Sequence, residues 1–167
     1  LDVPQGTGKY EQAGLWFGNN EENYIKLVVL SEPKGARLHY LMELAGKKVV
    51  EKNVSVTGLV GSNARLGMTV NPYNRSVELN YSINGGTTYK LETLLPPDEF
   101  FSFDAAGIDP EIGTRSFAGI FATHRHASAP RTYRFNEFTL QEGDGPLAPD
   151  SGVDFLRKSH NMSYPTS

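Results

Sequence analysis

The chain has 167 residues, of which 38% are hydrophobic and 21% charged, a composition that suits one globular domain rather than a disordered chain. Its net charge of −3 offers no basic surface of the kind that attracts nucleic acids or anionic membranes, so we expect neither as a partner. The lack of cysteine excludes thiolate zinc sites and cysteine nucleophiles, and the longest apolar run, Ile25 to Leu30, is too short to insert across a membrane.

The first half of the chain consists of short extended runs separated by Gly, Pro and Asn clusters, the pattern of an all-β protein. Apolar and polar residues alternate within these runs, as they do in strands with one buried face. The runs predicted as strands are Gln12–Phe17, Tyr24–Leu30, Leu38–Leu44 and a weaker stretch from Lys48 to Val50 that continues around Val54 and Val56.

The second half continues the same pattern. Asn84-Gly85-Gly86 tolerates positive φ angles and predicts a hairpin, and the small apolar run Ser116–Thr123 suits a central strand. A long loop is expected from Leu94 to Ile112, with a short helical turn at Pro97–Phe101. The other predicted strands are Arg65–Val70, Val77–Ile83, Thr87–Leu91 and a last strand at Tyr133–Leu140.

These elements predict a two-sheet antiparallel β-sandwich over residues 1–142. After Leu140 the composition changes to Gly, Pro and acidic residues, which is typical of an exposed linker. We therefore expect residues 143–167 to be a linker or tail that leads towards a further domain.

Several segments together resemble a known superfamily. The segments are Gln12–Phe17 with Glu22–Leu27, Arg65-Leu66, Leu79–Gly86, Ala118–Ile120 and Phe135–Leu140. In this order they resemble the concanavalin A-like lectin/glucanase superfamily (laminin-G-like jelly rolls), in the non-catalytic branch found in secreted multidomain proteins. The resemblance implies a jelly roll.

The resemblance also implies one or two strands before Gln12, where this chain has only Leu1 to Tyr10. We therefore expect the sandwich to lack its first strand within this chain, and a strand or domain partner to bind at the N-terminal edge. The tail from Asp154 to Ser167 is similar to the entry of a sugar-dehydrogenase-type β-propeller. That similarity raises the alternative of an accessory domain in a secreted sugar-active enzyme.

Catalysis by paired carboxylates is not expected. Retaining glucanases of the superfamily place two carboxylates on one strand, and no E-x-D-x-E run occurs here. No serine stands in a G-x-S-x-G elbow either. We expect a protein that is not an enzyme.

Two segments carry residue types that bind metals. His124 and His126 would face the same way on a strand and could hold a metal, but they lack identifiable further ligands, and a polar strand end is the favoured interpretation. The segment Asp104–Glu111 offers oxygen atoms that could hold calcium, although a solvated acidic loop is the favoured interpretation. We expect no obligatory cofactor, with calcium as the one candidate.

Four N-x-S/T sequons indicate an extracellular, secreted or cell-surface glycoprotein. The acceptor residues are Asn53, Asn74, Asn80 and Asn161. Asn80 is expected on the polar side of its strand.

A binding face is predicted on one sheet. If Ile25, Leu27 and Val29 face the core, then Tyr24 and Lys26 face outward, and the turn between the first two strands brings Trp16 alongside Tyr24. Aromatic rings that stack on sugars, beside fixed polar groups, are the equipment of carbohydrate sites. Further basic residues that could share the face are Arg37, His39, Arg65 and Arg125. The alternative is that Trp16 and Tyr24 are ordinary packing residues.

The expected function is extracellular recognition, by carbohydrate binding or adhesion. The alternative is a structural module that packs against neighbouring domains or subunits of an extracellular glycoprotein assembly.

Overall fold

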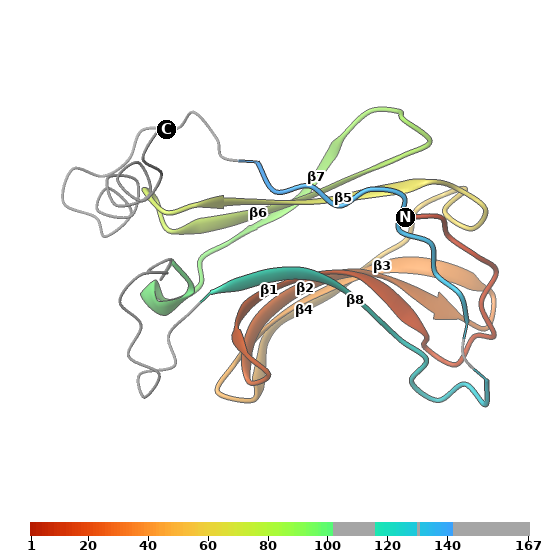
Figure 1. The fold of residues 1–167 in the computed structure, drawn as a ribbon, viewed down its shortest axis with the longest axis horizontal. Coiled ribbons are helices and arrows are strands. Elements are labelled where there is room, and N and C mark those ends of the chain that lie inside the picture. Colours follow the sequence, from red (N-terminus) through yellow and green to blue (C-terminus); the bar gives the residue numbers. More distant parts are fainter. Residues whose placement is uncertain (102–115, 130, 142–167) are drawn as a thin grey trace, which may run out of the picture.

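The computed structural model describes residues 1–101, 116–129 and 131–141. Within them the chain forms two antiparallel sheets that lie face to face (Figure 1). The predicted two-sheet β-sandwich is therefore confirmed. No helix in the described part of the chain has the length and apolar character that a bilayer crossing requires.

The larger sheet has five strands in the order β4-β3-β2-β1-β8. Their bounds are β1 Gln12–Asn20, β2 Asn23–Glu32, β3 Gly35–Leu44, β4 Lys47–Val54 and β8 Phe117–Thr123. Short hairpins join β1 through β4. The turn between β3 and β4 uses positive φ at Ala45 (49°) and Gly46 (70°), the conformation that two-residue hairpins favour.

The smaller sheet has three strands in the order β5-β6-β7. Their bounds are β5 Ala64–Asn71, β6 Ser76–Ile83 and β7 Tyr89–Leu94, and a 3₁₀ turn, η1 (Asp98–Phe101), follows. Asn84 and Gly85 adopt the positive φ values of 52° and 69°, which confirms the hairpin signal after β6. The helical turn expected near Pro97–Phe101 is also confirmed.

The core lies between the sheets and follows the predicted alternation. Ile25 and Leu27 of β2 are fully buried, and they pack with Leu79 of β6 and Phe100 of η1. A second buried cluster, which includes Val3, Val29 and Leu38, continues the core towards the N-terminus. Because every second residue of β2 faces this core, its other residues face the outer side of the five-stranded sheet.

Two predictions about strand positions are wrong. The segment Ser116–Thr123 forms β8, but β8 lies at the edge of the larger sheet among the described strands rather than at its centre. The segment Tyr133–Leu140 is not a strand: its only ladder contact with another described residue is an isolated bridge between Arg134 and Asp2. The apolar alternation of this segment is genuine, and Phe135 is half-buried, but no neighbouring strand supplies a continuous row of hydrogen-bonding groups.

The five-stranded sheet is arched, with its concave side turned away from the three-stranded sheet (Figure 1). The connections establish the sandwich but not the jelly-roll order, because β1–β4 and β5–β7 are simple consecutive neighbours. The jelly roll, like the missing first strand, stays a prediction.

Candidate functional site

Strand register places a grid of side chains on the concave face of the five-stranded sheet. Residues directly opposite each other in antiparallel strands point to the same side, so rows can be followed from β8 to β4. The first row holds Phe117, Gly18, Tyr24 and Glu43; the second Gly119, Trp16, Lys26, Leu41 and Glu51; the third Phe121, Gly14, Val28, His39 and Asn53; the fourth Thr123, Gln12, Leu30 and Arg37.

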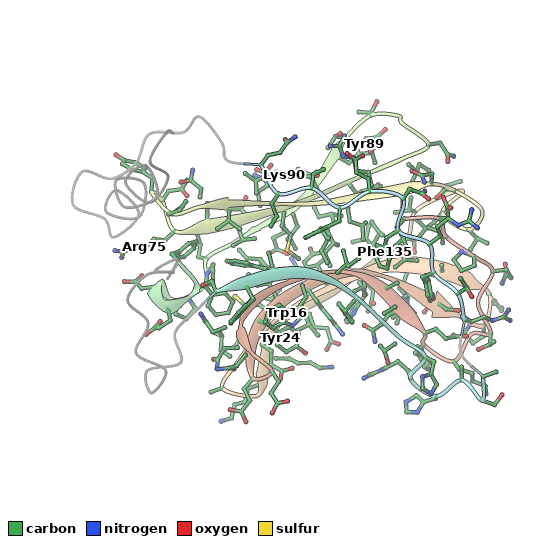
Figure 2. The ribbon with its side chains drawn as sticks, viewed as in Figure 1. Trp16, Tyr24, Arg75, Tyr89, Lys90 and Phe135 are labelled. Atoms are coloured by element: carbon green, nitrogen blue, oxygen red, sulfur yellow. The ribbon has the colours of Figure 1, made fainter. Side chains whose placement is uncertain are left out.

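The first two rows form an aromatic platform, which we define as Trp16, Tyr24 and Phe117. The rings of Trp16 and Tyr24 are stacked, with centroids 5.8 Å apart and planes inclined by 20°. Both project from the sheet on its concave side (Figure 2). Phe117 on the edge strand is 52% exposed, so much of the platform is open to solvent.

Glycines alternate with the aromatic residues and leave space between their side chains. Gly18 separates Phe117 from Tyr24 in the first row, and Gly119 stands next to Trp16 in the second. A Cβ atom added to Gly119 would meet nothing within 4 Å, which shows open space directly beside the indole. The platform therefore combines ring faces with open space at Gly119.

Lys26 is the central cation of the face. It is only 8% exposed, and its Nζ donates a hydrogen bond of 2.8 Å to Oε1 of Gln12. Gly14 lies between these two residues in register and has no side chain to obstruct the contact. Burial and the nearby charges of Arg125 and Lys48 lower the pKa of Lys26 to about 8.

A second polar group centres on His39 and Glu51. Nε2 of His39 lies 3.2 Å from Oε1 of Glu51, which also accepts a 2.8 Å hydrogen bond from Nζ of Lys48. Burial and the charge of Lys26 lower the pKa of His39, so the imidazole stays neutral at pH 7. Its Nδ1 is buried and has no hydrogen-bond partner among the described residues.

Two carboxylates of this face, Glu43 and Glu51, are already engaged. The hydroxyl of Tyr24 donates to Oε2 of Glu43 at 3.3 Å, and hydrogen bonds from Lys48 and His39 lower the pKa of Glu51. A carboxylate with a lowered pKa is a poor proton donor at neutral pH. The arrangement suits hydrogen bonding to a ligand better than general acid catalysis.

Most of the residues predicted for this face do lie there. Trp16, Tyr24, Lys26 and His39 are neighbours in the grid, and Arg125, in the turn after β8, is close enough for its charge to affect both Lys26 and Tyr24.

Two of the predicted arginines lie apart from this group. Arg37 sits at the far end of the face and forms an ion pair with Glu32. Arg65 requires a correction: it is exposed on β5 of the other sheet, opposite Ser82, because β5 belongs to the three-stranded layer.

The sequons are distributed over both sheets. Asn53 is exposed on β4 at the rim of the concave face, beside His39, and Asn74 is exposed in the turn between β5 and β6. Asn80 lies on the outer face of the smaller sheet, half-buried over Gly67. Its predicted orientation agrees with this position. Asn161 lies outside the described residues.

Within the described part of the chain, the histidine pair acquires no further ligands. The described residues hold no cluster of three or more His, Asp or Glu side chains that could share an ion, and His124 and His126 flank Arg125 in an exposed turn. The proposed calcium segment Asp104–Glu111 lies outside the described residues.

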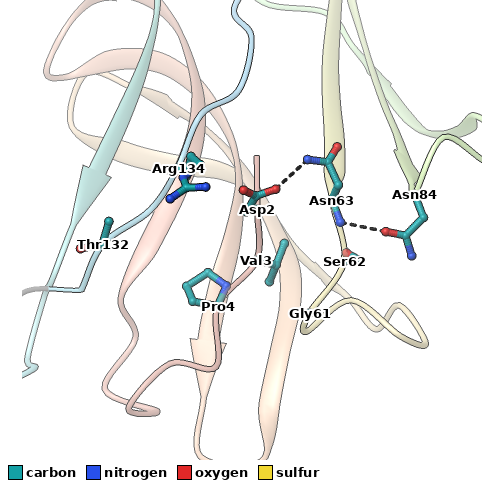
Figure 3. A pocket seen from close by; sticks show the side chains of 9 residues that line it. All are labelled: Asp2, Val3, Pro4, Gly61, Ser62, Asn63, Asn84, Thr132 and Arg134. Atoms are coloured by element: carbon teal, nitrogen blue, oxygen red, sulfur yellow. Dashed lines mark hydrogen bonds between the residues drawn. The ribbon is translucent and has the colours of Figure 1, made fainter.

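A separate shallow hollow of about 530 Å³ lies at the N-terminal end of β5 (Figure 3). Its polar lining includes Asp2, Asn63, Asn84 and Arg134, none of which belongs to the predicted binding face. Asn63 donates a 2.8 Å hydrogen bond to Oδ1 of Asp2, as Figure 3 shows.

Sequence reasoning did not identify Phe117, Phe121, Gln12 or the glycines of the grid. A signal was present: Gly14, Gly18 and Gly119 stand two residues from an aromatic residue on the same strand. It becomes readable only when register aligns β8 with β1. Comparisons with family models, with curated proteins and with solved structures find no match to this chain.

Proposed function

We propose that this chain is a non-catalytic carbohydrate-binding module of the concanavalin A-like type, acting outside the cell. The observation that carries the proposal is the aromatic platform beside a buried polar network on one concave face. Sugar rings present apolar faces that stack on aromatic side chains, and their hydroxyls need fixed donors and acceptors. Trp16 and Tyr24 supply the first requirement, and Lys26 with Gln12, next to them in the grid, supplies the second.

The curvature supports a saccharide of more than one residue. The grid extends over four rows from Phe117 to Arg37, so a chain could stack on the platform and reach the polar network beyond it. The exposed acceptors Asn53 and Asn74 are compatible with a secreted protein.

A glycan array probed with the whole chain tests this function. We expect binding to at least one glycan class, and loss of it in the double variant Trp16→Ala/Tyr24→Ala. Tyr73→Ala is the matched control, because Tyr73 is 56% exposed in the turn of the other sheet. Concentration-dependent self-association with no glycan signal would instead support the structural assembly module.

A further inference from the structure

One edge of the smaller sheet has backbone hydrogen-bonding groups that no other described strand pairs. Ala64 exchanges two backbone hydrogen bonds with Leu1, so the N–H and C=O groups of Ala64 point away from β6. In a strand, alternate residues direct these groups to the same side. Those of Leu66, Met68 and Val70 therefore also point to this edge, where β5 has no further neighbour among the described strands.

The N-terminal segment already starts a strand along this edge. Leu1 pairs with Ala64, and Val3 exchanges hydrogen bonds with Ser62 and Gly61, so the segment runs antiparallel to β5. Asp2 forms antiparallel bridges to Asn63 on one side and to Arg134 on the other. Figure 3 shows Asp2 between these two residues. Leu1 is thus paired with the first residue of β5. The space along the edge of β5 beyond this pair is called the slot below.

The apolar surface near this edge is incompletely covered. Ala118, Ile120 and Ala122 of β8 face the inner side of the larger sheet, opposite Phe17, Leu15 and Ala13. Ile120 is nevertheless 42% exposed, whereas Ile25 and Leu27 on the same face of β2 are fully buried. The three-stranded sheet therefore leaves the inner side of β8 open.

We propose that the free edge of β5 accepts one further β-strand, formed by an extended segment that is joined to the nitrogen of Leu1 and runs antiparallel to β5. The strand β5 has eight residues, and Ala64 is already paired, so seven positions face the slot. Continuing the ladder satisfies the free groups of Leu66, Met68 and Val70 and makes the smaller sheet four-stranded.

Register specifies the chemistry of this strand. Ala64, Leu66, Met68 and Val70 face the core, and the residue opposite each one shares its face. The second, fourth and sixth residues before Leu1 therefore face inward, and they should be apolar so that they cover Ile120 and its neighbours. The first, third and fifth face solvent and should be polar. A shift by one residue would place the apolar set in water.

Two extensions of the whole chain test the proposal. One adds seven residues before Leu1, alternating Thr and Val so that Val occupies the inward positions. The matched control has the same alternation displaced by one residue. Amide hydrogen exchange, followed by NMR, reports on the groups concerned: in the unextended chain the amides of Leu66, Met68 and Val70 should exchange rapidly, and those of Arg65, Gly67 and Thr69 slowly.

We expect the first extension to slow exchange at Leu66, Met68 and Val70 at least about tenfold, and the displaced extension to have a smaller effect. The proposal is overturned if neither extension protects these amides or if both protect them equally. A third sample, the unextended chain with the same heptapeptide added free in solution, distinguishes the source of the strand. Protection by the free peptide and not by the extension would contradict the assignment to a segment joined to Leu1.

Discussion

Trp16 on β1 and Tyr24 on β2 are stacked across a strand pair, with ring centroids 5.8 Å apart, although the register sets Trp16 opposite Lys26 and Tyr24 opposite Gly18. The contact is thus a diagonal one, and it depends on the missing side chain of Gly18. It converts two half-buried rings into one surface next to the most buried cation of the sheet.

Two of the glycines next to Trp16, Gly14 and Gly119, should affect stability differently when replaced by alanine. A Cβ atom on Gly14 would lie 2.7 Å from Cα of Val28 and would also collide with the carbonyl oxygen of Leu27, so strands β1 and β2 would have to separate. We expect Gly14→Ala to reduce the free energy of unfolding by about 2 kcal/mol. Gly119→Ala enters open space and should leave it unchanged or raise it by less than about 1 kcal/mol. Urea unfolding measures both, and equal losses would contradict this account of β1.

Glu11 should stabilise the fold in a pH-dependent manner. Burial would raise its pKa, but hydrogen bonds from the Thr7 hydroxyl and from the backbone N–H groups of Thr7 and Lys9 lower it to about 2. Because the folded pKa lies below the ordinary value of 4.5, the stabilisation is present above pH 4.5 and is lost as the pH falls towards 2.

Glu11→Gln should therefore cost about 2 kcal/mol at pH 7, and the difference from the unmodified protein should shrink between pH 4.5 and 2.5. Unfolding by urea at a series of pH values measures the difference. Glu21→Gln, in the exposed turn between β1 and β2, is the control and should have little effect at any pH. A constant difference for Glu11→Gln across this range would show that the buried charge is not responsible.

Lys26 should make stability rise with pH as well, but in an alkaline range. Its folded pKa of about 8 lies below the ordinary 10.5, so between these values the folded state holds fewer protons than the unfolded state. Stability attributable to Lys26 then rises with pH across this window.

The free energy of unfolding of the unmodified protein, relative to Lys26→Met, should increase by about 2 kcal/mol from pH 8 to 10.5. The reference variant cancels the contributions of the tyrosines, which titrate in the same range. Lys34→Met, in the exposed turn between β2 and β3, is the control and should track the unmodified protein. A flat difference for Lys26→Met would mean that Lys26 is better hydrated than its position indicates.

Glycosylation at Asn53 should interfere with the concave face. Asn53 lies in the same row as His39, so a glycan attached there would cover the polar network. In protein secreted from eukaryotic cells, we expect Asn53→Gln to bind saccharide at least about tenfold more tightly than the glycosylated protein, or about 1.4 kcal/mol. Asn74→Gln removes an acceptor from the other sheet and should not alter affinity. Equal effects of the two substitutions would contradict the placement of the site.

Much of the fold was predictable because alternation directly reports which face of a strand is buried. The period-two pattern of Tyr24–Leu30 correctly identified Ile25 and Leu27 as core residues, and Asn84-Gly85 correctly marked a hairpin. The same signal misled at Tyr133–Leu140, whose alternation is strand-like but which has a ladder partner only at Arg134. The alternation shows which side chains a segment can bury. A strand also requires a neighbouring segment with which its backbone can form hydrogen bonds.

The binding face was only partly predictable for a related reason. Trp16 and Tyr24 were accessible from sequence because a short turn joins their strands. Phe117 is about a hundred residues away along the chain, and its position beside Gly18 depends on the pairing of β8 with β1. Arg65 was predicted on the same face because no local signal in the sequence shows which of the two sheets a strand belongs to.

The most direct test of the central claim uses Trp16 itself, the only tryptophan in the chain. Titration of the intact protein with a glycan identified on the array, followed by tryptophan emission, reports on the platform alone. We predict a saturable change in emission and reduced quenching by acrylamide, with a midpoint equal to the dissociation constant from calorimetry. Binding seen in calorimetry, with Trp16 emission and quenching unchanged, would contradict the assignment of the concave face as the carbohydrate site.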